Sequence, residues 1–140
     1  MKEHVAVGLL AMVLLVWGCE PERTLVPRME PLPSDVPVPT TFKFDPADST
    51  DFASQSTKER YSNYHYTGRA YFVDVVDFYK RQMPIDGWQL QQDADTGGRK
   101  MLYYKKAGAD PTKPETPTCI VTIFASGEIA NAIRIFRTEK

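Results

Sequence analysis

The segment from Tyr61 to Tyr71 holds four tyrosines, one histidine and one arginine. Aromatic rings offer flat apolar faces, and histidine and arginine add hydrogen-bond donors, so such a group can bind a sugar or a peptide. The candidate binding residues are Tyr61, Tyr64, His65, Tyr66 and Arg69. Strands are ordinarily rich in aromatic residues. Core packing of these tyrosines is therefore the simpler interpretation, and a binding surface is the alternative.

The sequence predicts no metal, no cofactor and no catalytic residue. It contains two histidines, His4 and His65, and a zinc site needs three or four clustered ligands. There is no GxSxG motif, and the "TGGRK" stretch lacks the length and the following helix of a phosphate-binding loop. We therefore expect a protein that is not an enzyme.

Two groups of aspartates contain oxygen atoms that could bind a cation. Asp93 and Asp95 have the spacing of a calcium loop, but the further oxygen donors and the later glutamate are missing, so a turn is expected. The group of Asp45, Asp48 and Asp51 is expected to be a solvated loop.

The N-terminal segment is apolar from Val5 to Gly18, after a short polar start. Fourteen helical residues span about 21 Å, which is short of the roughly 30 Å of a bilayer core. Residues 1–18 are therefore expected to be a signal peptide. A transmembrane anchor is the alternative.

The end of this segment resembles the lipobox of bacterial lipoproteins, with Val16, Trp17, Gly18 and Cys19 in its four places. Trp17 is bulkier than usual at its position. The resemblance implies cleavage between Gly18 and Cys19 and acylation of Cys19, for example with palmitate. Two or three acyl chains on one residue give a stable membrane anchor. The expected location is the cell envelope, on either membrane.

The second cysteine, Cys119, lies in the apolar stretch "TCIVTIF". It is expected to be a buried residue rather than a reactive thiol.

Residues 19–41 are expected to be the lipidated cysteine followed by a tether. Six prolines occur between Glu20 and Thr41, and proline prevents both helix and central strand. An extended spacer is the main interpretation, and the alternative is a ligand for a proline-recognition domain. Part of the stretch from Val36 to Phe44 could instead lie along the folded domain as an edge segment.

A single domain is expected from residue 42 to 140. The segment 51–68 predicts a hairpin closed by Gly68, and the spacing of apolar residues in 72–83 predicts an amphipathic helix that ends at Pro84. Four strands should follow, with residues 118–125 in the centre. The expected fold class is α+β, with two layers: one helix packed on a mainly antiparallel sheet of about five to six strands. The other sheet face should carry polar residues with Tyr and Phe136.

The formal net charge is −1, which argues against a nucleic-acid partner. The stretch "FYKRQMPIDGWQL" resembles a segment of small bacterial lipoproteins, through Phe78-Tyr79, Met83-Pro84 and Gly87-Trp88. That resemblance implies export and a similar fold, and no activity. The functional hypothesis is a lipid-anchored, non-catalytic module that binds an envelope protein. The alternative is a lipoprotein that binds a small ligand, a sugar or a peptide.

Overall fold

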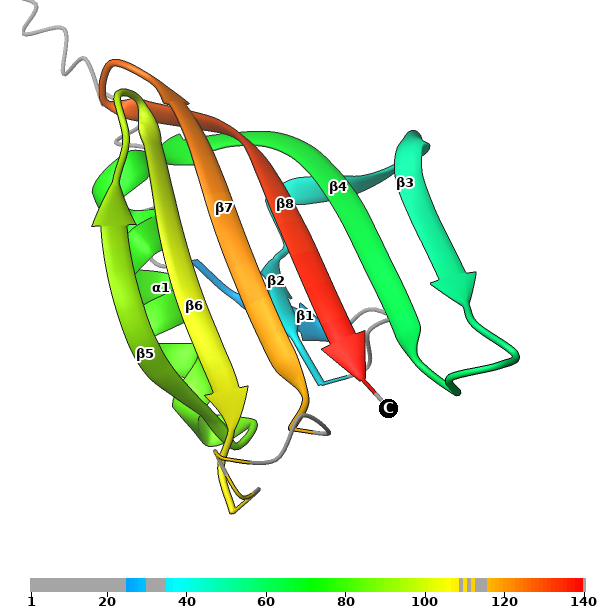
Figure 1. Ribbon diagram of the computed structural model, residues 1–140. Coiled ribbons are helices and arrows are strands. Elements are labelled where there is room, and N and C mark those ends of the chain that lie inside the picture. The colour runs from blue at the N-terminus through cyan, green and yellow to red at the C-terminus, as the bar shows by residue number, and fades with distance from the viewer. Residues whose placement is uncertain (1–24, 30–34, 109, 111, 113–115, 140) are drawn as a thin grey trace, which may run out of the picture.

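The structure is a computed structural model that describes residues 25–29, 35–108, 110, 112 and 116–139. These residues form an α+β fold of two layers, as the sequence predicted (Figure 1). The main layer is an antiparallel sheet with the strand order β3-β4-β8-β7-β6-β5. Its strands are β3 (Phe42–Ala53), β4 (Arg60–Tyr71), β5 (Trp88–Asp95), β6 (Arg99–Lys106), β7 (Thr118–Ser126) and β8 (Ile129–Glu139).

The two central strands, β7 and β8, show why this sheet has two different faces. Cys119, Val121 and Ile123 on β7 are fully buried, and so are Ile133 and Ile135 on β8. Because successive side chains of a strand point to opposite sides, the residues between them face away from this core. The central position of β7 agrees with its continuous apolar sequence.

The helix α1 (Phe72–Ile85) connects β4 to the far edge of the sheet and covers part of one face. Its buried side chains are Val75, Val76, Phe78, Tyr79 and Met83. The helix continues through Pro84 to Ile85, slightly beyond the predicted end. Gly87 then adopts a φ of +82°, a conformation that glycine tolerates, and the chain turns into β5.

A small second sheet lies on the same side of the main sheet as α1. Its presence contradicts the tether that was expected for this part of the chain. β1 (Pro27–Met29) and β2 (Pro37–Pro39) pair antiparallel and lie behind the main sheet in Figure 1. Leu25, Val36 and Val38 are buried in the same core as the helix. The prolines prevent central pairing but allow a two-stranded ribbon, since the apolar residues between them gain burial. The spacer predicted for residues 19–41 is therefore wrong for residues 25–29 and 35–41.

Gly68 has a different role from the one predicted. It lies inside β4, opposite Phe42, rather than at the end of the hairpin. A Cβ atom at Gly68 would lie 2.4 Å from the carbonyl oxygen of Thr41, which is closer than van der Waals contact allows. Glycine therefore lets the start of β3 approach and pair with β4 at close range.

In the described part of the chain, no helix is long and apolar enough to cross a membrane. The expected signal peptide of residues 1–18 and the lipobox with Cys19 lie outside the described residues.

Candidate functional site

The predicted binding residues do not form one surface, because they alternate along β4. Tyr64 and Tyr66 are 5% and 0% exposed and belong to the core. Tyr61 and His65 point to the opposite side of the sheet. Arg69 is exposed and lies within the irregular pairing between Thr67 and Ala70. The predicted binding surface of five residues is therefore wrong as a unit, and core packing applies to its two central tyrosines.

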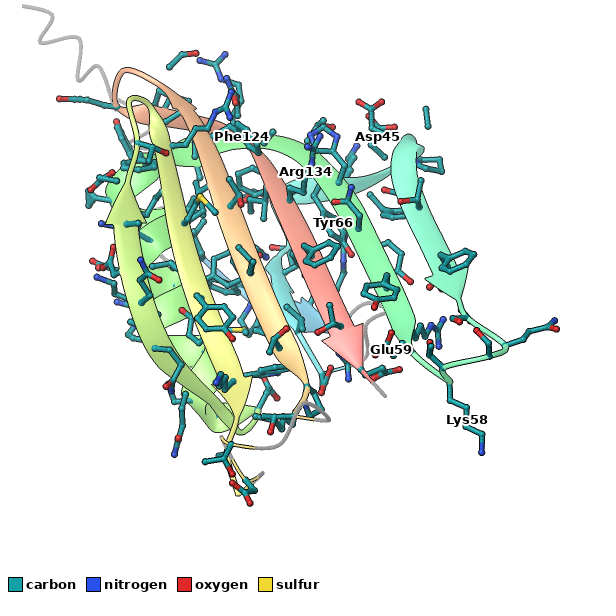
Figure 2. The ribbon with its side chains drawn as sticks, in the orientation of Figure 1. Asp45, Lys58, Glu59, Tyr66, Phe124 and Arg134 are labelled. Carbon is teal, nitrogen blue, oxygen red and sulfur yellow. The ribbon has the colours of Figure 1, made fainter. Side chains whose placement is uncertain are left out.

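The face of the main sheet that points away from α1 is the candidate functional surface, and we call it the open face. It faces the viewer in Figures 1 and 2. No described segment covers it. Its large apolar side chains with more than a third of their surface exposed are Phe52, Tyr61, Met101 and Phe136.

The strand register brings these side chains together. Phe52 on β3 pairs with Tyr61 on β4, at one end of the sheet. Phe136 on β8 pairs with Ile120 on β7, and Ile120 pairs with Tyr103 on β6. Directly opposed side chains on one face lie about 4.5–5.5 Å apart. The open face therefore carries a continuous apolar row across its central strands, in agreement with the prediction of Tyr and Phe136 on this side.

Basic residues border this apolar row. The guanidinium carbons of Arg99 and Arg134 lie 5.2 and 5.7 Å from the centre of the Phe124 ring. Figure 2 shows Phe124, Arg134 and Asp45 at the same end of the sheet. With Lys105, the regularly paired parts of β8, β7 and β6 present three arginine or lysine side chains on this face and no acid. The central open face is thus apolar and positively charged.

At the edge of the open face, β3 brings two acids to His65. The pairing of β3 with β4 is interrupted between Asp45 and Thr50. Within that interruption, one carboxylate oxygen of Asp45 and one of Asp48 each lie 3.7 Å from His65 Nδ1. The group of Asp45, Asp48 and Asp51 was expected to be a solvated loop; it lies in the strand β3 instead, so the loop prediction is wrong, although Asp48 is solvent-exposed. A signal was present: Pro46 inside a strand favours a bulge, which folds nearby side chains together.

The other aspartates of these groups form ion pairs on the opposite side. Asp51 accepts hydrogen bonds from Arg60 at 2.5 Å, from Tyr64 and from Ser62, and Arg60 in particular lowers the pKa of the Asp51 carboxyl. Asp93 and Asp95 lie in β5 rather than in a turn. Asp93 pairs with Lys100 at 2.5 Å and with Lys80 of α1 at 2.6 Å. These acids therefore have structural partners.

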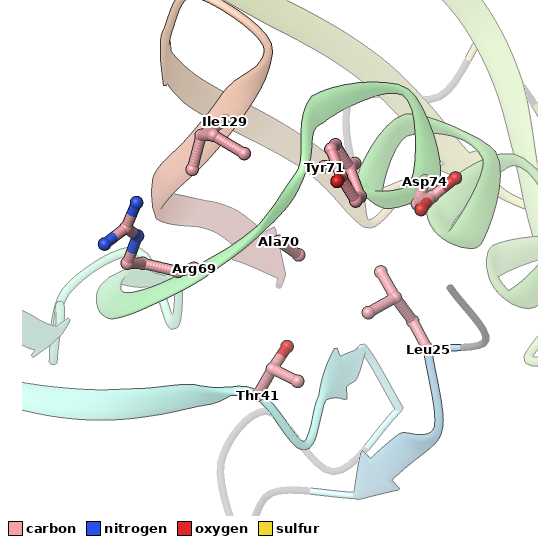
Figure 3. A pocket seen from close by; sticks show the side chains of 7 residues that line it. All are labelled: Leu25, Thr41, Arg69, Ala70, Tyr71, Asp74 and Ile129. Carbon is pink, nitrogen blue, oxygen red and sulfur yellow. The ribbon is translucent and has the colours of Figure 1, made fainter. Parts of the chain in front are cut away.

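A small pocket lies where the N-terminal segment meets the helix. It has a volume of about 330 Å³ and is lined by Leu25, Thr41, Arg69, Ala70, Tyr71, Asp74 and Ile129. Figure 3 shows Leu25 and Thr41 on one side, with Tyr71 and Asp74 on the other. Asp74 and Arg69 give the pocket one acidic and one basic side chain at its border. Of the five predicted binding residues, Arg69 lines this pocket and the other four do not.

Cys119 is buried in the core, as predicted. Burial raises the pKa of its thiol to about 12 and raises the pKa of Tyr79 well above its ordinary value. A thiol that stays protonated is a poor nucleophile. Cys119 therefore acts as a small apolar residue in the core.

Comparisons of the chain with protein-family models, with curated proteins and with solved structures found no match. The two resemblances described from the sequence stay predictions.

Proposed function

We propose that this chain is a lipid-anchored protein of the cell envelope, held through Cys19, whose domain binds a protein partner on the open face without catalysing a reaction. The observation that carries this proposal is the combination of exposure and composition on that face. Apolar residues form a row across the central strands, and none of the described segments covers them. Contiguous exposed apolar surface on a folded domain is typical of an interaction site.

The charges define the chemistry of the partner. Arg99, Lys105 and Arg134 surround the row, and no acid lies on the same face of the regularly paired parts of β6, β7 and β8, the three strands that carry it. Complementary charge favours correct orientation during association and disfavours wrong partners. The partner should therefore present a protein segment that combines apolar and acidic side chains.

The position of the anchor agrees with this arrangement. Leu25, six residues after Cys19, is buried on the helix side of the sheet, opposite the open face. An anchor that approaches from the helix side would leave the open face accessible. Since the chain from Cys19 to Thr24 is short, we expect the domain to stay close to the membrane surface.

Site-specific photocrosslinking in cells that produce the full chain tests the open face. A photoreactive phenylalanine analogue replaces Phe136 in one variant and Val73 in the control. Val73 lies on the exposed side of α1 and is 55% exposed, against 37% for Phe136. We expect one dominant protein adduct from position 136 and none from position 73.

Reversal of the charge at Arg134 tests whether the partner segment is acidic. Arg134→Glu should weaken the adduct from position 136, since the partner segment is acidic. Adducts of equal yield from both positions, or no adduct from position 136, would contradict the proposal. A membrane lipid as the sole adduct would also contradict it.

A second candidate function is small-ligand binding in the pocket near Arg69. Its volume of about 330 Å³ lies at the lower end of the range for ligand sites, and its border carries both charges. A sugar or a short peptide fits this chemistry. Thermal unfolding of the full chain with a panel of both compound classes tests it. A rise in Tm that Arg69→Gln removes would support this function, and no rise would reject it.

A further inference from the structure

Three potential metal ligands converge at the edge of the open face. They are one carboxylate oxygen of Asp45, one of Asp48 and Nδ1 of His65, and all three atoms lie within 4.8 Å of one another. Asp45 and His65 are register partners on β3 and β4, and Asp48 comes from the four-residue bulge between Asp45 and Thr50. Two strands and a bulge therefore position the cluster.

Hydrogen bonds fix which atoms point into the cluster. Asp45 accepts the backbone N–H of Ala47 through Oδ1 at 3.1 Å, which leaves Oδ2 to face His65. Ser49 holds the bulge to β4, because its hydroxyl donates to the Asp45 carbonyl at 2.6 Å and accepts the His65 backbone N–H at 2.9 Å. These contacts order the backbone on both sides of the cluster.

The histidine nitrogen supplies a separate indication of a ligand. Nδ1 of His65 is buried and has no hydrogen-bond partner among the described residues. Its distances of 3.7 Å to both carboxylates exceed hydrogen-bond length. A buried polar atom without a hydrogen-bond partner indicates a bound ion or water at that position. Tetrahedral zinc bonds of about 2.0–2.1 Å separate neighbouring ligands by about 3.3–3.4 Å, so small side-chain shifts would close the site.

We propose that Asp45, Asp48 and His65 bind a divalent transition-metal cation, Zn²⁺ or Mn²⁺. One imidazole and two carboxylates match the ligand preferences of these ions. Calcium and magnesium prefer sets of oxygen ligands alone. Two carboxylates neutralise the charge of the ion. Asp48 keeps 64% of its side chain exposed, so water can complete the coordination.

Arg134, a cation on the same face, leaves room for the metal. Arg134 is the register partner of His65 on β8. Its guanidinium group lies over the Phe124 ring, and Phe124 belongs to β7, on the side of β8 away from His65. Repulsion between Arg134 and the metal is reduced accordingly.

Calorimetric titration tests the site. Zn²⁺, Mn²⁺ and Ca²⁺ are added separately to the full chain in detergent, without a histidine tag and with His4→Ala, so that His65 is the remaining histidine. We expect saturable binding of one Zn²⁺ or Mn²⁺ per chain, tighter than Ca²⁺. His65→Ala and Asp48→Asn should each weaken binding at least about 10-fold, as removal of coordinating or supporting groups does elsewhere.

The matched control is Asp77→Asn, which removes an exposed carboxylate on α1 and should leave binding unchanged. Asp48→Asn keeps the test valid if His65→Ala does not fold. Absence of saturable Zn²⁺ or Mn²⁺ binding would overturn the proposal. Binding that Asp48→Asn and His65→Ala leave intact, or that is equally tight for Ca²⁺, would also overturn it. None of these outcomes depends on whether a protein partner binds the open face.

Discussion

Asp35, in the turn before β2, accepts a hydrogen bond of 2.6 Å from Lys106 at the end of β6, although 71 residues separate them in the chain. Arg137 of β8 pairs with the same carboxylate at 2.7 Å. The indole N–H of Trp88 donates to the Asp35 carbonyl at 2.9 Å, and Lys106 Nζ lies 4.5 Å from the centre of the Trp88 ring. One aspartate thus joins the proline-rich segment to three strands of the main sheet.

Asp35→Ala should destabilise the domain. The change leaves Lys106 and Arg137, whose side chains are 29% and 15% exposed, without this counter-charge. Loss of one partner of a largely buried pair lowers the free energy of unfolding by about 1–3 kcal/mol. Urea unfolding followed by circular dichroism measures the change. Asp77→Ala on the exposed side of α1 is the control, and an equal effect of both substitutions would contradict the role of Asp35.

Gly68→Ala should also destabilise the domain, for a steric reason. The new Cβ would lie 2.4 Å from Thr41 O and 2.9 Å from Phe42 Cα, both of which are backbone atoms that cannot turn away. Forced backbone shifts cost about 1–3 kcal/mol. Gly108→Ala is the control, because its Cβ meets nothing within 4 Å and tests only the strain of a positive φ. The same unfolding measurement should show a larger loss in the free energy of unfolding for Gly68→Ala than for Gly108→Ala. The reverse order would contradict the close approach of β3 to Gly68.

Asp93 should make stability depend on pH. Lys100 and Lys80 hold the pKa of the Asp93 carboxyl below its usual range. A group with a lowered pKa in the folded state stabilises the protein above its unfolded pKa of about 3.9, and that contribution is lost as the pH falls through the folded value. Asp93→Asn should therefore lower Tm at pH 7, and its difference from the wild type should shrink below about pH 4.

Thermal unfolding at several pH values measures this difference. Asp77→Asn removes an exposed carboxylate that forms no ion pair within the described residues, and it should give curves parallel to the wild type. A constant difference between Asp93→Asn and the wild type from neutral to acid pH would contradict the ion pairs.

The order of the helix and of the strands of the main sheet could be predicted from local patterns. The spacing of Val75, Val76, Tyr79 and Met83 indicated the helix face, and all four are buried in it. The continuous apolar run of residues 118–125 indicated a central strand. Both features depend on the period of hydrophobic residues, which is a local property.

The candidate sites could not be predicted in the same way, because they depend on register. Alternation places Tyr64 and Tyr66 on the same face of the sheet. Only the position of α1 shows that this face is the buried one. The approach of Asp48 to the paired Asp45 and His65 depends on a bulge, in which β3 advances five residues, to Thr50, while β4 advances two. Val36 and Val38 are core residues, which agrees with the alternative that part of the stretch from Val36 to Phe44 lies along the folded domain; the proline content alone favoured a spacer.

Cys19→Ala should abolish lipid attachment. If Cys19 carries the acyl chains, cells fed labelled palmitate should label the wild-type chain and not the variant. Each buried methylene contributes about 0.8 kcal/mol to membrane affinity, so the variant should also leave the membrane fraction. Cys119→Ala is the matched control and should keep the label. Persistent labelling of Cys19→Ala would contradict the anchor.

Cys119 should be unreactive until the domain unfolds. Its side chain is fully buried, and burial raises the pKa of the thiol to about 12, so little thiolate forms near pH 8. In the Cys19→Ala chain, where Cys119 is the one remaining cysteine, we expect alkylation at least about 100-fold slower than for a free thiol. Denaturant should restore the ordinary rate, because reaction then proceeds through opening of the core. Fast alkylation without denaturant would mean that β7 is not the protected centre of the sheet.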